Sequence, residues 1–114
     1  MTLRYDLRIN QGETFQLTIP VLDDDGSAAS LTGFTAKGQI RSHAASPTVL
    51  YEWSATNANL AFEDNDVVLT VPAAHSSLWT FRTGVWAVEL VDGAEVTSRL
   101  VGGMVIVHPE VVRP

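Results

Sequence analysis

The three histidines, His43, His75 and His108, are the side chains best suited to bind a transition metal or to act as a general base. They lie far apart in the chain, and their spacing shows no pattern that would bring them together as zinc ligands. Ser76 and Ser77 follow His75, but a serine hydrolase also needs an exposed nucleophile turn such as G-x-S-x-G, which the sequence lacks. We therefore expect no catalytic residue and three unrelated surface histidines.

Acidic residues offer hard oxygen ligands in two places, residues 23–25 and residues 63–66. Neither place has the D-x-D-x-D-G spacing of an EF-hand loop for calcium. Aspartate is also common in turns because its carboxylate accepts hydrogen bonds from nearby backbone amides. The sequence favours solvated turn residues, and we expect neither a metal nor a cofactor.

The composition restricts the classes of protein to which the chain can belong. Its 114 residues suit one domain, and a hydrophobic fraction of 46% with 18% charged residues argues against disorder. A net charge of -6 predicts that nucleic acid is not a partner. No apolar run approaches the ~20 residues that span a bilayer, and residues 1–6 do not resemble a signal peptide. We expect a protein that folds in the cytoplasm and has no membrane partner.

Alternation of apolar and polar residues indicates strands along most of the chain. The expected strands cover residues 3–9, 15–21, 34–41, 48–54, 60–71 as a hairpin, and 85–107 as a second hairpin around Asp92-Gly93. Pro20 is expected at a sheet edge or a bulge, and residues 72–79 form one or two helical turns between the sheets. About seven or eight short strands predict an all-β antiparallel sandwich in a single domain, 1–114, with 108–114 as an extended tail.

The last strand departs from simple alternation, because its second half is apolar on both faces. The face that carries Met104 and Ile106 is covered either by this chain or by a partner subunit. Gly102 and Gly103 in mid-strand indicate a bulge or a close approach of another backbone segment. Trp53 and Trp79 either anchor an interface or fill the core. The candidate interface residues are Met104, Ile106, Trp53, Trp79, His108, Val111 and Val112.

Several segments, in this order, resemble a family of small phage virion proteins, the N-terminal domains of upper baseplate proteins. They are Gln11-Gly12-Glu13-Thr14-Phe15, Asp24-Asp25-Gly26, Leu31-Thr32-Gly33-Phe34-Thr35-Ala36, Gln39-Ile40-Arg41, Leu69-Thr70-Val71-Pro72-Ala73-Ala74, Gly84-Val85-Trp86-Ala87-Val88-Glu89-Leu90 and Arg99-Leu100-Val101-Gly102-Gly103-Met104-Val105. The resemblance implies an immunoglobulin-like sandwich built into a phage particle. Upper baseplate proteins carry a longer C-terminal region that links to receptor-binding subunits, and the 114 residues here contain no such region.

The resemblance implies a non-enzymatic structural protein of the virion, assembled in the host cytoplasm, that binds other virion proteins. A tail or baseplate position is expected, with multiple copies or a symmetric homo-oligomer in the particle. A capsid decoration or cement protein on the head surface is the alternative. A carbohydrate- or host-binding module is a further alternative, in which Trp53 and Trp79 are exposed beside residues 42–47.

Overall fold

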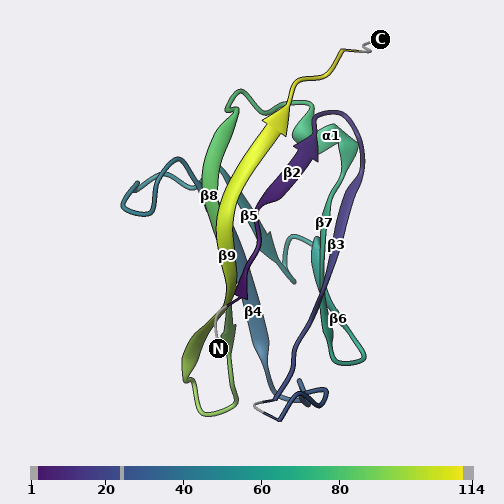
Figure 1. Ribbon diagram of the computed structural model, residues 1–114, viewed down its shortest axis with the longest axis vertical. Coiled ribbons are helices and arrows are strands. Elements are labelled where there is room, and N and C mark those ends of the chain that lie inside the picture. The colour runs from purple at the N-terminus through teal and green to yellow at the C-terminus, as the bar shows by residue number, and fades with distance from the viewer. Residues whose placement is uncertain (1–2, 24, 112–114) are drawn as a thin grey trace.

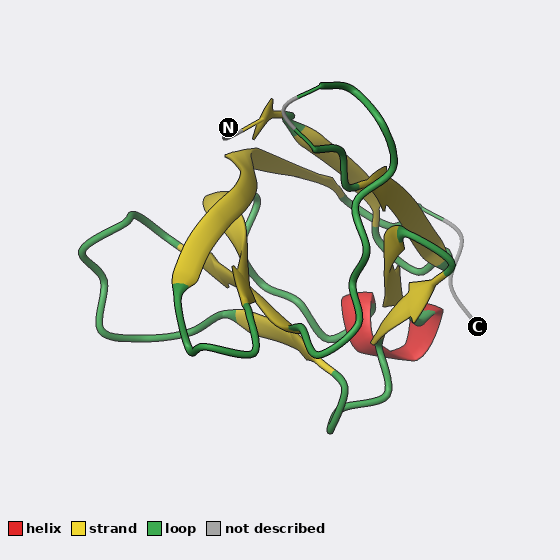
Figure 2. Ribbon diagram, turned by 90° about the horizontal axis from the view of Figure 1, so that it is seen from below, coloured by secondary structure: helices red, strands yellow, loops and turns green. Residues whose placement is uncertain are grey.

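The computed structural model describes residues 3–23 and 25–111, and it shows two β-sheets packed face to face (Figure 1). A view along the strands shows the sheets on either side of the interior (Figure 2). The elements are β1 (Leu3–Arg4), β2 (Leu7–Asn10), β3 (Phe15–Pro20), β4 (Thr35–Arg41), β5 (Tyr51–Ser54), β6 (Leu60–Glu63), β7 (Asp66–Val71), α1 (Ala73–Ser76), β8 (Thr83–Val91) and β9 (Thr97–His108).

The order of the strands identifies the type of sandwich. The larger sheet runs β1-β9-β8-β4-β5, with β2 also paired to β9, and the smaller sheet runs β3-β7-β6. The order β9-β8-β4-β5 matches the G-F-C-C′ sheet of immunoglobulin domains, and the order β3-β7-β6 matches their B-E-D strands. The prediction of an immunoglobulin-like β-sandwich is confirmed, and α1 connects β7 of one sheet to β8 of the other, as expected.

The first strand differs from the prediction in two ways. It is interrupted after Arg4 to give β1 and β2, which brings the number of strands within the described residues to nine, and both pair with β9 in parallel. Tyr5 is 52% exposed although alternation placed it inside. The interruption has a local cause, because a side-chain oxygen of Asp6 accepts the backbone amide of Met104 at 2.9 Å, in place of a backbone partner.

The core follows the predicted alternation and needs no disulfide. Trp86, Val88 and Leu90 of β8 face the interior and are buried, as expected. The ring of Trp53 lies edge-on to that of Trp86, with centroids 6.2 Å apart. Gly38 of β4 makes room for this pair, since a Cβ there would lie 3.0 Å from the Trp53 ring.

Trp53 and Trp79 therefore fill the core. Their exposed fractions are 0% and 9%, and Trp53 donates a hydrogen bond from its indole to the carbonyl of Thr70. The hypothesis that they anchor an interface is wrong for the folded chain, because an anchor has to be accessible before the partner binds. Burial in the apolar interior is the simpler use of so large a side chain.

The hairpin of β8 and β9 contains a β-bulge, at a different residue from the one that the sequence indicated. Val88 pairs with Val101 whereas Glu89 pairs with Arg99, so Leu100 is an extra residue. Leu100 and Val101 are consequently both buried. The bulge lies at Leu100 and not at Gly102-Gly103.

Candidate protein interface

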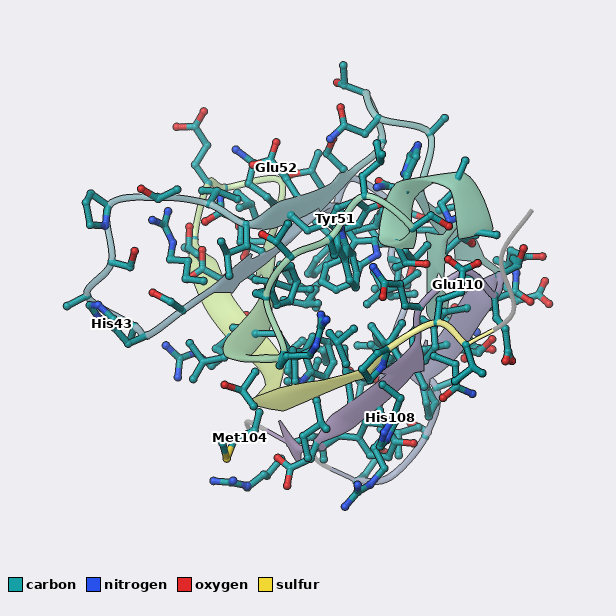
Figure 3. All side chains as sticks on the ribbon, turned by 90° about the horizontal axis from the view of Figure 1, so that it is seen from above. His43, Tyr51, Glu52, Met104, His108 and Glu110 are labelled. Carbon is teal, nitrogen blue, oxygen red and sulfur yellow. The ribbon has the colours of Figure 1, made fainter. Side chains whose placement is uncertain are left out.

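The outer face of the larger sheet carries three of the predicted interface residues, Met104, Ile106 and His108, all on β9. Met104, Ile106 and His108 alternate along β9 with the buried Val105 and Val107. Met104 is 44% exposed, and Ile106 is half-buried. Figure 3 shows Met104 and His108 on the outside of the sheet and Tyr51 turned toward the interior. Within residues 3–23 and 25–111, the elements that contact β9 most extensively are its sheet neighbours β8, β2 and β1.

The two glycines of β9 allow other backbone segments to approach closely. A Cβ on Gly103 would overlap the carbonyl of Tyr5 and lie 2.8 Å from the Asp6 carboxylate, and one on Gly102 would lie 3.1 Å from the carbonyl of Trp86. Of the two predicted alternatives, close backbone approach is the one that applies. Gly103 thus fixes where the N-terminal strand crosses β9, whereas Gly102 faces β8.

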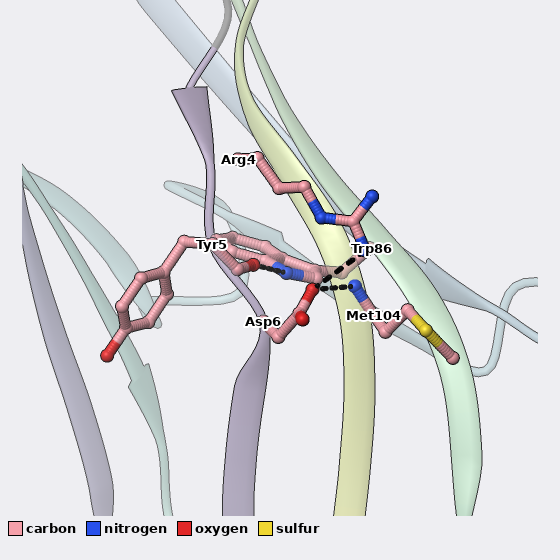
Figure 4. A network of polar contacts seen from close by, with 5 residues as sticks. All are labelled: Arg4, Tyr5, Asp6, Trp86 and Met104. Carbon is pink, nitrogen blue, oxygen red and sulfur yellow. Dashed lines mark hydrogen bonds and ion pairs between the residues drawn. The ribbon is translucent and has the colours of Figure 1, made fainter.

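Polar contacts hold that crossing in place (Figure 4). The indole Nε1 of Trp86 donates to the carbonyl of Tyr5 at 2.7 Å, and the amide of Tyr5 donates to the carbonyl of Gly102 at 3.0 Å. Arg4 forms an exposed ion pair of 3.4 Å with Asp6. Because exposed pairs contribute little, the backbone contacts and the Trp86 bond are what position Arg4 at the rim of the face.

A groove of about 590 Å³ crosses this outer face. Its floor is formed by β8 with Ala87 and by β9 with Gly102, both small residues. Arg4 and Leu3 of β1 form one wall, and Ala44, from the loop between β4 and β5, lines the opposite side. That loop projects from the body in both Figure 1 and Figure 2.

Positive charge gathers around the groove. Four of the seven basic residues of the chain line it, whereas Glu89 is the only acidic lining residue among the described ones. The basic residues are Arg4, Lys37, Arg41 and Arg99. A fifth, Arg8, lies on the same face because it pairs with Ile106 across β2 and β9.

Hydrogen bonds fix part of this charged surface. Arg41 donates to the carbonyl of Ser46 at 2.6 Å and to the side-chain oxygen of Gln39 at 2.8 Å. Gln39 in turn donates to Glu52 at 2.9 Å. These bonds tie the projecting loop to the sheet, so the groove has a defined wall before any partner binds.

Sequence reasoning missed this groove because it considered charge over the whole chain. The signal is present in the strand patterns, where Arg4 and Arg8 occupy the polar positions of one strand and Lys37 and Arg41 those of another. Only the pairing of β1, β2, β9, β8 and β4 in one sheet brings those polar faces together.

The tail after β9 is attached to the body through Gln11. The backbone amide of Gln11 donates to the carbonyl of His108, and its side-chain oxygen accepts the amide of Glu110 at 3.2 Å. Its side-chain amide donates to the carbonyl of Trp79 at 2.8 Å. Val111 is 89% exposed, and Val112 lies outside the described residues.

The polar residues first considered for chemistry have structural partners. The hydroxyl of Tyr51 lies 2.7 Å from Nδ1 of His75 and accepts a hydrogen bond from the buried Asn59. Burial raises the pKa of Tyr51, partly offset by the bond from Asn59, so this hydroxyl is a poor base or nucleophile at neutral pH.

The acidic turns show the local bonding expected of turn residues. Asp25 accepts hydrogen bonds from the hydroxyl (2.6 Å) and the amide (3.0 Å) of Ser27, and these bonds lower its pKa. Within the part of the chain that the structure describes, no three histidine or carboxylate groups are placed to hold a metal ion, and no helix is long and apolar enough to cross a membrane.

Comparison with known protein families and with curated proteins gives no match to this sequence.

Proposed function

We propose that the chain is a non-enzymatic structural protein of a phage virion that binds other virion subunits through the outer face of its larger sheet. The observation that carries this proposal is the open groove on that face. Its basic rim adjoins the half-buried Val85 and Ile106 and the exposed Met104. Apolar side chains surrounded by charged ones are typical of an interface core and its rim.

The resemblance to upper baseplate domains supports a tail or baseplate position over the head surface. As a decoration or cement protein on the head, the same face would contact the shell, so the two positions differ in partner and not in mechanism. A carbohydrate- or host-binding role receives less support, because Trp53 and Trp79 are buried and unavailable for stacking on a sugar.

Replacement of Met104 by serine tests the proposed face. Met104 is exposed on the outer face, so Met104→Ser should change the free energy of unfolding by less than about 0.5 kcal/mol while lowering the number of copies bound per particle. Leu78→Ser is the matched control, since Leu78 is 81% exposed and comes from the turn after α1.

The readout is the amount of chain in purified particles, with cryo-electron microscopy to locate it. Density at the tail tip supports the baseplate position, and density on the head lattice supports decoration. Equal incorporation of both variants, or absence of the chain from particles, would contradict the proposal.

A further inference from the structure

The distribution of charge makes one end of the molecule acidic. Three connections, residues 21–34, 63–66 and 92–96, carry acidic residues and no lysine or arginine. All three lie at the lower end in Figure 1. The described acidic residues of this end are Asp23, Asp25, Glu63, Asp64, Asp66, Asp92 and Glu95.

The three connections adjoin one another. The amide of Val21 donates to the carbonyl of Asn65 at 3.2 Å, which joins the first to the second. A Cβ built on Gly93 would lie 4.0 Å from the carbonyl of Gly33, which joins the third to the first. We call this surface the acidic end, and the groove with Arg4, Lys37, Arg41 and Arg99 the basic groove.

We propose that the basic groove receives the acidic end of a second copy of this chain. The inference rests on the proposed function, in which several copies assemble in one particle. The two surfaces are complementary in charge, because four basic residues line the groove and seven described acidic residues lie at the acidic end.

Electrostatics also selects the orientation. Two acidic ends repel each other, as do two basic grooves, so only end-to-groove contact is attractive. Such a contact joins two different surfaces of the same chain, and its repetition builds a ring or an open row of subunits. A phosphate backbone would also meet positive charge at the groove, but the net charge of -6 on the whole chain opposes its approach.

Self-association of the purified full-length chain gives the first test. Sedimentation velocity across a range of concentrations should show assemblies larger than the monomer at low ionic strength. These should dissociate at about 1 M salt, where the Debye length is about 3 Å. A chain that stays monomeric under all conditions would overturn the proposal.

Charge exchange gives the decisive test. A groove variant, Arg4→Glu with Lys37→Glu, changes two exposed side chains, and an end variant, Asp23→Lys with Glu63→Lys, changes two others. Each variant alone should associate at least about tenfold more weakly than the original chain, because the groove variant makes the groove net negative and the end variant removes part of the negative charge that the groove attracts. An equimolar mixture should recover association, because the unchanged groove of the end variant can then bind the unchanged acidic end of the groove variant.

Matched controls apply the same charge changes elsewhere. Arg82→Glu and Glu13→Lys alter exposed residues outside both surfaces and should leave association unchanged, with unfolding midpoints showing that every variant folds. Three outcomes would each overturn the proposal. The groove variant self-associates as strongly as the original chain, the mixture fails to associate, or the chain binds duplex DNA more tightly than a second copy.

The outcomes separate this inference from the proposed function. A chain that is monomeric alone but incorporated into particles contradicts the end-to-groove contact and leaves the structural role standing. A chain that passes the charge-exchange test but never joins particles contradicts the structural role and leaves the contact standing.

Discussion

The indole nitrogen of Trp86 donates a 2.7 Å hydrogen bond to the backbone carbonyl of Tyr5, which joins residues 81 positions apart. Trp86 is buried, and a buried indole N–H needs an acceptor. The carbonyl of Tyr5 is available because the N-terminal strand is interrupted there. The interruption between β1 and β2 and the burial of Trp86 are thus parts of one arrangement.

Replacement of Trp86 by phenylalanine should destabilise the fold by about 1–3 kcal/mol, because it leaves the Tyr5 carbonyl without its donor and opens a small void. Urea unfolding measures the loss. Amide exchange of residues 3–10 should quicken more than that of β7. A loss below about 0.5 kcal/mol would show that water replaces the indole without cost.

Gly103→Ala should destabilise the chain by about 1–3 kcal/mol, because the added methyl group would overlap the Tyr5 carbonyl and push β1 away from β9. Gly93→Ala is the control, since a Cβ there meets nothing closer than 4.0 Å. Denaturant midpoints of the two variants give the comparison, and equal stability would contradict the close crossing at Gly103.

Trp53→Ala should cost about 3–5 kcal/mol of unfolding free energy, as expected for a fully buried tryptophan. Leu78→Ala should change stability by less than about 0.5 kcal/mol, because Leu78 is exposed. Calorimetry or urea unfolding distinguishes them. A small loss of unfolding free energy in Trp53→Ala together with weakened assembly would show that Trp53 belongs to an interface.

Tyr51 should make the fold sensitive to alkali. Its pKa in the folded chain is raised above the ordinary value of 10.0 by burial, so the unfolded chain loses this proton first. The stabilising contribution is complete below about pH 10 and is lost as the pH rises through the folded pKa. Urea unfolding between about pH 9 and pH 11 should therefore show a steeper decline than in Tyr51→Phe, and equal slopes would contradict the assignment.

The sequence predicted the elements better than the contacts between them. Alternation located β3, β4 and β8, because each has one more buried and one more solvated face. It did not locate the bulge at Leu100. Two consecutive apolar residues, Leu100 and Val101, are also what a regular strand with both faces buried would show.

The candidate site was predicted in part for a related reason. Met104 was identified because an apolar residue on an outward position is unusual, and the structure leaves it exposed. The burial of Trp53 depends on space above Gly38, which is set by a contact between strands and not by the local pattern. The basic groove likewise exists only once β1, β4 and β9 share a sheet.

The parallel pairing of β2 with β9 determines how the domain responds to a pulling force. The described chain starts below the middle of Figure 1 and leaves β9 at the upper end, so tension along it slides the two strands past each other. Their hydrogen bonds are then loaded together in shear, so they have to break together and not one after another. Because forced rupture is governed by the unfolding barrier, this geometry should make the domain resist tension applied between β2 and the end of β9.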